Sequence, residues 1–304
     1  MRHLKSSGVF EDDLITVFRS LHRRECNERL LVLTAVDVEA VITPADGAFL
    51  LQVAPQDAGY AVRHLLQYDA ENLPPPPLPP PPPLYPHAWV GSLIYALVLV
   101  GVAWVLSSGL VRLDAFDLGE LDAARLQAGE WWRAWTALTL HLDAPHLVAN
   151  LGAGSWFGYL AARQMGSGNA WFITVTGAAL ANLLEGLLAP PGHRAVGAST
   201  AVFSALGAMS AYSWRERFAL PQRWARRWGP LIAGVILLGW TGAGGEGTDV
   251  DVVAHLAGFA VGAVLGATAA LPRYRRMLQR VPQWLTGTAA LASLAIAWGW
   301  ALSS

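Results

Sequence analysis

The sequence predicts an all-α polytopic membrane protein with a small α/β domain at its N-terminus. Of the 304 residues 54% are hydrophobic and only 14% are charged, whereas soluble domains average about 25% charged residues. Apolar runs close to the length that a bilayer requires recur from residue 88 to the end of the chain. The stretch before them has a different pattern, which alternates between strand-like and helix-like segments.

Residues 1–72 predict the element order β-α-β-β-α. The turn-forming sequence Pro44-Ala-Asp-Gly47 separates two β-rich stretches and predicts a hairpin. This region shows no catalytic cluster, and we interpret its histidines and the single cysteine, Cys26, as surface or core residues. The strand-like stretches are residues 14–18, 38–43 and 48–53, and the helix-like stretches are residues 21–36 and 56–72.

A polyproline linker, residues 73–87, follows the small domain. It contains ten of the chain's 19 prolines, and such a segment adopts the extended polyproline II helix, with a rise of about 3.1 Å per residue. We expect a stiff spacer between the small domain and the membrane. A docking site for a proline-binding partner is the alternative.

Residues 88–304 alternate between apolar runs and polar connections. Arg163 lies at the end of the second run, and several arginines follow the fourth and sixth runs, which indicates that these three connections are cytoplasmic. The N-terminus is then cytoplasmic and the C-terminus external, in a multi-pass protein of the cell (plasma or inner) membrane. The net charge of −1 argues against nucleic acid as a partner. The predicted spans are residues 88–108, 145–164, 169–189, 199–213, 229–243, 250–271 and 284–302.

Four polar residues within the predicted spans are candidates for chemistry, because polar groups are costly inside a bilayer. His146, Asn150, Ser199 and His255 all belong to spans that run inward, and all lie in the outer half. Ser199 follows Gly197-Ala198 at the start of a predicted helix, where backbone N–H groups favour a developing negative charge. A serine at this place also fits a simple helix N-cap.

The chemistry of these residue types suggests their roles. Ser199 needs a base to become a nucleophile, and His255 is the natural choice. No carboxylate lies within the same span unless Asp251 folds back, so a dyad is favoured over a triad. His146 and Asn150 are spaced i, i+4 and share a helix face, where they are candidate oxyanion donors together with the Ser199 amide.

Glycines would allow the two spans that carry Ser199 and His255 to approach closely. Gly258, Gly262 and Gly266 form a small-xxx-small stripe below His255. Ordinary helix packing around a satisfied histidine is the alternative interpretation of this stripe.

Several separated motifs resemble the rhomboid family of intramembrane serine proteases. The resemblance covers about residues 88–271. It rests on Gly129-Glu-Trp-Trp-Arg133 with the segment up to Asn150, on Gly197-Ala-Ser-Thr200, and on Ala254-His-Leu-Ala-Gly258 with Gly262.

The resemblance implies a six-helix core, to which residues 284–302 add a seventh helix. It implies that Ser199 is the nucleophile and His255 the general base, and that His146 and Asn150 line the oxyanion hole. Phe203 matches an aromatic position beside the catalytic histidine, and Trp132 and Arg133 match a structural loop motif. Residues 241–249 match a flexible cap. Thr200 departs from the family's usual glycine. This residue either narrows the site, alters which residue is accepted before the cut, or is harmless if its side chain faces away.

The predicted function is that of an intramembrane serine endopeptidase. It would cut transmembrane protein substrates near the outer face through a Ser–His dyad, without a metal or cofactor. Two alternatives remain: an inactive rhomboid-like protein that binds membrane helices, and a proton-coupled transporter that uses His146, Glu185 and His255. The substrate, the oligomeric state, and the roles of Glu185 and residues 1–72 do not follow from the sequence.

Overall fold

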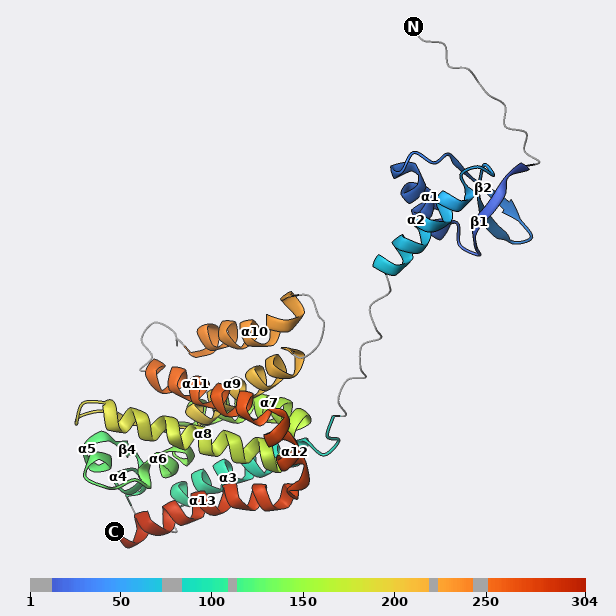
Figure 1. Cartoon of the computed structure of the whole chain (residues 1–304). Helices are drawn as coiled ribbons and strands as arrows, with labels where there is room; N and C mark the ends of the chain where they lie inside the picture. The colour runs from blue at the N-terminus through green and yellow to red at the C-terminus, as the bar shows by residue number, and fades with distance from the viewer. Residues whose placement is uncertain (1–12, 73–83, 109–113, 219–223, 243–250) are drawn as a thin grey trace. The chain divides into compact units, whose positions relative to one another are not determined.

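The computed structural model describes residues 13–72, 84–108, 114–218, 224–242 and 251–304 (Figure 1). The chain divides into two compact units, residues 1–77 and residues 78–304. We call them the N-terminal unit and the membrane unit.

The N-terminal unit has the element order that the sequence predicts. Its three strands form an antiparallel sheet in the order β1-β3-β2. Apolar side chains from the sheet and both helices make its core, among them Leu33, Leu51 and Leu65. The elements are β1 (Ile15–Ser20), α1 (Arg23–Ala35), β2 (Ala40–Ala45), β3 (Ala48–Val53) and α2 (Ala58–Glu71).

The predicted hairpin joins β2 to β3 through two residues. Ala45 pairs with Ala48, and the intervening Asp46 and Gly47 have φ of 48° and 73°. Positive φ at both central residues is what a tight two-residue hairpin turn demands, and Asp-Gly supplies it at low cost. The single cysteine, Cys26, is fully buried in this unit.

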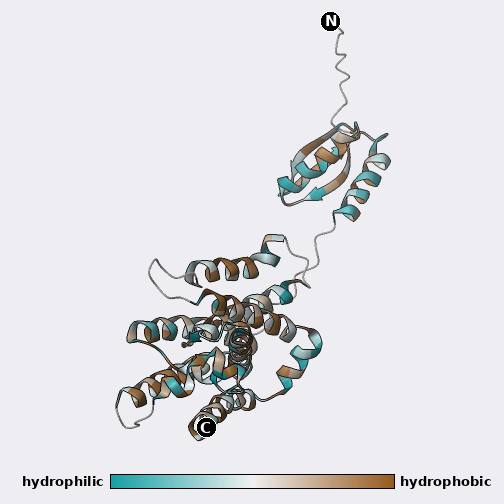
Figure 2. Cartoon of the chain, turned by 90° about the vertical axis from the view of Figure 1, so that its left-hand side faces the viewer, coloured by the Kyte–Doolittle hydropathy of each residue, from teal (hydrophilic) through white to brown (hydrophobic). Residues whose placement is uncertain are grey.

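The membrane unit has a helix at each predicted span. Four of these helices, α3, α8, α11 and α13, are long and apolar enough to cross a membrane. Figure 2 shows long hydrophobic stretches along the helices of this unit. The chain is therefore a multi-pass membrane protein, and the predicted fold class is confirmed. The helices are α3 (Trp89–Ser107), α7 (Ala144–Met165), α8 (Ser167–Leu188), α9 (Ser199–Phe218), α10 (Trp224–Gly242), α11 (Val252–Ala269) and α13 (Gln283–Ser303), with the short α12 (Pro272–Arg280) before the last.

Helix α8 occupies the centre of the membrane unit, where it contacts α7, α9, α11 and α13 (Figure 1). Helices α9 and α11 lie side by side along their lengths, and α10 packs on the outside of this pair. The unit is thus built around α8, α9 and α11, and two of these three helices carry Ser199 and His255.

The connection between α3 and α7 folds into short elements around a buried arginine. Arg133 is 1% exposed. Its guanidinium donates to Glu130 Oε2 at 2.7 Å and to the carbonyl oxygens of Glu120 and Asp117 at 2.8 and 2.7 Å. Neighbouring Trp132 packs against α13. The elements are α4 (Ala115–Gly119), β4 (Leu121–Asp122), α5 (Ala123–Gln127), α6 (Arg133–Thr136) and the 3₁₀ turn η2 (Ala137–Thr139).

This connection also supports the loop that leads into α9. Strand β4 pairs with β5 (Arg194–Ala195), which precedes Ser199. Arg194 reinforces the pairing through ion pairs with Glu120 at 2.9 Å and Asp122 at 3.3 Å. The start of α9 is therefore fixed by a segment that lies far away in the sequence.

Candidate active site

Ser199 is the first residue of α9, and backbone hydrogen bonds hold the turn before it. Gly197 has φ of 127°, a conformation that side chains disfavour. Its N–H donates to the Ala137 carbonyl at 2.9 Å, and the Ala198 N–H donates to His141 Nε2 at 3.4 Å. Ser199 is half-buried. The glycine therefore allows a sharp turn that presents the serine at a helix N-terminus.

Helices α9 and α11 touch backbone to backbone along a stripe of glycines. The Cα atoms of Gly258, Gly262 and Gly266 face Thr200, Ser204 and Ala208 respectively, with no space for a side chain between them. Both series increase along the chain, so the two helices run parallel. His255 lies one turn before Gly258, and Ser199 lies immediately before Thr200. The register therefore brings both residues to the same end of the helix pair.

The phenyl ring of Phe203 packs beside the imidazole of His255. Their ring centroids are 4.4 Å apart, and both side chains are buried. Phe203 is four residues after Ser199, and residues at this spacing share one helix face. The imidazole thus lies within about one helical turn of the serine.

Asp251 caps α11 and has other contacts than the imidazole of His255. Its Oδ1 accepts from the Ala254 N–H at 2.9 Å, and its Oδ2 lies 3.3 Å from His193 Nε2. Both carboxylate oxygens of Asp251 therefore have neighbours at the start of α11 and in the loop before β5.

His146 and Asn150 approach the serine from α7. Gly197 presents its Cα directly to the imidazole of His146, and a methyl group there would lie 3.8 Å from Asn150 Nδ2. Asn150 is 5% exposed. Its side-chain amide donates to the backbone carbonyl of His146 at 3.1 Å, and its backbone carbonyl accepts from the Tyr95 hydroxyl at 2.8 Å. Because an amide nitrogen has two N–H groups, Asn150 retains a donor for an oxyanion.

Thr200 does not face away from the helix contact. It is 3% exposed, and its carbonyl and Cγ2 lie against Gly258 of α11. The glycine on the opposite helix provides the space that a β-branched side chain needs. The threonine therefore occupies the interface between α9 and α11.

His141 lies beside the candidate site residues, although it was not selected from the sequence. Its ring centroid lies 5.1 Å from that of His146, and its Nε2 accepts from the turn before Ser199. Burial, and to a smaller extent the neighbouring His146, lower the pKa of His141 to about 4. A neutral imidazole can accept the Ala198 N–H, so His141 helps to shape the turn. Its position five residues before His146 was the only feature of the sequence that could have pointed to its place beside the site.

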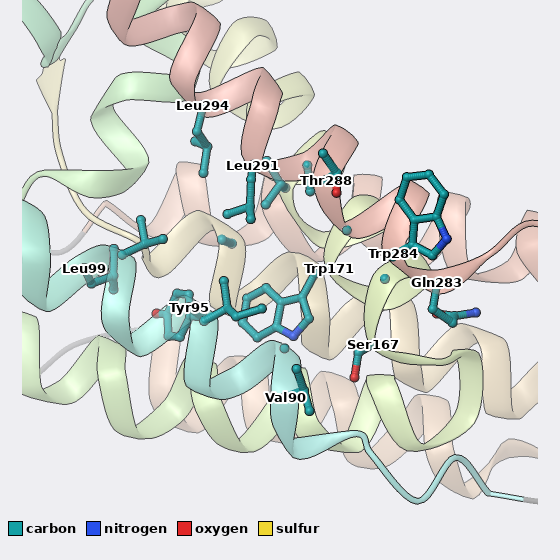
Figure 3. Close-up of a pocket in the computed structure, with 18 of the residues that line it drawn as sticks. Val90, Tyr95, Leu99, Ser167, Trp171, Gln283, Trp284, Thr288, Leu291 and Leu294 are labelled. Carbon is teal, nitrogen blue, oxygen red and sulfur yellow. The ribbon is translucent and has the colours of Figure 1, made fainter.

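An apolar pocket of the described residues lies apart from this chemistry. It has a volume of about 540 Å³ and lies among α3, α8 and α13. Figure 3 shows its lining, in which the stacked rings of Tyr95 and Trp171 face Leu291 and Leu294. Ala198 and Ala201 border it, but Ser199 and His255 do not line it. It contains no carboxylate, and we assign it no catalytic role.

The predicted cap and Glu185 complete the set of residues that the sequence singled out. Most of the predicted cap, residues 243–249, lies outside the residues that the structure describes. Glu185, in the last turn of α8, lies 3.2 Å from His193 Nε2.

Comparison with known proteins gives two matches. Residues 128–272 match the family profile described as the Rhomboid domain. The chain is also 28% identical over 167 residues to the Rhomboid protease GluP of Bacillus subtilis (strain 168), a match that covers 55% of this chain and 31% of that protein. The matched domain contains every residue of the candidate site, from His141 to Gly262. The chain therefore carries a rhomboid domain.

Proposed function

We propose that this protein is an intramembrane serine endopeptidase that cuts transmembrane protein substrates. Ser199 is the nucleophile and His255 the general base. His146, Asn150 and the Ser199 N–H stabilise the oxyanion. The reaction needs no metal or cofactor.

The observation that carries the proposal is the register between α9 and α11. The three glycine contacts and the Phe203–His255 ring contact bring a serine and a histidine from distant parts of the chain to one end of a helix pair. Two potential oxyanion donors on α7 border the same turn. Structural polar residues would have no reason to meet in this way.

The proposed reaction proceeds in two steps. Ser199 Oγ attacks the peptide carbonyl while His255 accepts its proton, and the tetrahedral oxyanion is stabilised by the donors on α7 and α9. The carbon–nitrogen bond then breaks as His255 returns the proton to the leaving amine, which leaves an acyl ester on Ser199. Water attacks the ester with His255 again as base, and the carboxylic acid product departs.

The arginine-rich connections lie at the ends of the spans opposite to the candidate site, and their charge supports a cytoplasmic location for those ends. We therefore place the cut near the outer face of the substrate's span, with the N-terminus of the enzyme in the cytoplasm and its C-terminus outside. Peptide bonds in an intact helix are shielded by their hydrogen bonds. Substrates with helix-weakening residues at the cut are therefore expected to react fastest.

A serine-reactive probe tests the proposal directly. We expect a fluorophosphonate to modify Ser199 in the purified full-length chain, as mapped by mass spectrometry, and we expect His255→Ala to lose this modification. Labelling of Ser199 that persists at the same rate in His255→Ala would contradict the dyad. An unlabelled Ser199 in a folded wild-type chain would favour the inactive relative or the transporter.

Removing an oxyanion donor is expected to slow cleavage without unfolding the protein. We expect Asn150→Ala to lower kcat for a transmembrane reporter by about 10²–10³-fold, because a donor to the oxyanion is lost. Gln164→Ala removes an amide elsewhere on the same helix, where it accepts a hydrogen bond from Ser213, and is expected to change kcat little. Equal rates for both variants would exclude Asn150 from the oxyanion hole.

A further inference from the structure

Three side chains that could each bind a metal ion lie together beside the N-terminus of α11. Glu185 comes from the last turn of α8, His193 from the loop before β5, and Asp251 from the N-cap of α11. One donor atom from each side chain lies within 4.8 Å of the other two. None of these residues has a role in the proposed reaction.

Glu185 is the member that hydrogen bonding within the protein leaves unexplained. Its side chain is 3% exposed, and neither buried carboxylate oxygen has a hydrogen-bond partner among the described residues. A buried carboxylate without compensation costs several kcal/mol. The guanidinium of Arg194, the residue after His193, is already paired with Glu120 and Asp122. A cation shared with His193 and Asp251 would remove this cost.

Two of the three distances between donor atoms match the edges of a metal coordination shell, and all three lie within 4.8 Å. His193 Nε2 lies 3.2 Å from Glu185 Oε1 and 3.3 Å from Asp251 Oδ2. Donors at about 2.0–2.1 Å from a tetrahedral zinc ion are separated by roughly 3.3–3.4 Å. The Nε2–H group of His193 can donate a well-aligned hydrogen bond to only one of the two carboxylates. One metal ion can contact all three side chains.

The backbone positions the ligands in advance. The His193 N–H donates to the Pro190 carbonyl at 2.9 Å, and the His193 carbonyl accepts from the Ala123 N–H at 3.1 Å. The Oδ1 atom of Asp251 accepts the hydrogen bond that caps α11. Its Oδ2 atom can therefore bind a metal ion. His193 and Asp251 are about a quarter exposed, at 26% and 25%, so an ion can reach the site and a water can complete its shell.

We propose that Glu185, His193 and Asp251 bind one zinc ion. The donor set of one imidazole and two carboxylates suits Zn²⁺ better than the all-oxygen preference of Ca²⁺ or Mg²⁺. Two carboxylates and a neutral imidazole also balance the charge of a dication. The ion joins the end of α8 to the start of α11, one turn before His255, and so fixes the end of α11 that carries the imidazole.

Metal content measured on the chelator-treated, full-length chain without a polyhistidine tag tests the site. After dialysis against micromolar Zn²⁺, we expect wild type to bind one ion more per chain than His193→Ala, Glu185→Gln or Asp251→Asn. We also expect Zn²⁺ to raise the melting temperature of wild type but not of these variants. Co²⁺ in place of Zn²⁺ should give a visible tetrahedral spectrum only in wild type.

The control is His87→Ala, which removes a histidine elsewhere in the membrane unit and should keep the ion. Each of the three variants tests the same ion independently. If one variant fails to fold, the zinc content of the other two still decides whether the site exists. Equal zinc content in wild type and in the folded variants would place the metal elsewhere and overturn the proposal. A wild type that binds no zinc would show that the cluster is a histidine–carboxylate bridge only. Neither readout requires proteolysis, so this test is separate from that of the proposed function.

Discussion

Replacing Ser199 with alanine is expected to lower the cleavage rate of a transmembrane reporter by at least about 10⁴-fold, because no other group in the site can form the acyl ester. The fold should persist, since Ser199 is only half-buried and no hydrogen bond of the structure depends on its side chain among the described residues. The measurement is the initial rate in reconstituted vesicles, with size-exclusion profiles to compare folding.

Ser204→Ala is the matched control for this experiment. Ser204 lies one turn further along the same helix, is fully buried, and packs between Gly177 of α8 and Gly262 of α11. Its variant is expected to cleave within a few-fold of wild type. If Ser199→Ala cleaved as fast as Ser204→Ala, the nucleophile would have to be sought elsewhere.

Gly262→Ala is expected to have the largest effect on stability. A methyl group at this position would meet the backbone oxygen and Cα of Ser204, neither of which can move without displacing α9. Overpacking a core costs about 1–3 kcal/mol, and we expect about 3 kcal/mol here because backbone is displaced rather than a flexible side chain. Unfolding in mixed detergent micelles measures this loss, and probe labelling of Ser199 should fall with it.

Gly101→Ala makes the same chemical change on α3, where a methyl group would meet no atom within 4 Å. It should be neutral or slightly stabilising, because alanine favours a helix over glycine by up to about 1 kcal/mol. A Gly262→Ala variant as stable as Gly101→Ala would show that the two helices do not depend on backbone contact.

The sequence predicted those features that depend on local pattern. Hydropathy located the helices, Asp46-Gly47 located the hairpin turn, and the i, i+4 spacing of His146 and Asn150 placed them on one face. The glycine stripe also predicted the close approach of α9 and α11, because small residues at every fourth position allow two helix backbones to come into contact.

Features that depend on the meeting of distant segments could not be predicted in this way. His141 joins the site because the turn before Ser199 donates a hydrogen bond to it, and nothing in its neighbourhood in sequence indicates that contact. Glu185, His193 and Asp251 lie in three different segments, and two helices separate the last from the others. Their spacing matches no metal-binding motif, so only the folded chain brings their donor atoms together.

The burial of Cys26 in the N-terminal unit has a practical consequence. The only native thiol is shielded from water-soluble maleimides as long as that unit is folded. Pairs of cysteines introduced on exposed positions of the membrane unit can therefore carry spin labels or fluorophores while the natural residue stays in place. Distances between α10 and its neighbours then become measurable in a lipid bilayer with the complete chain.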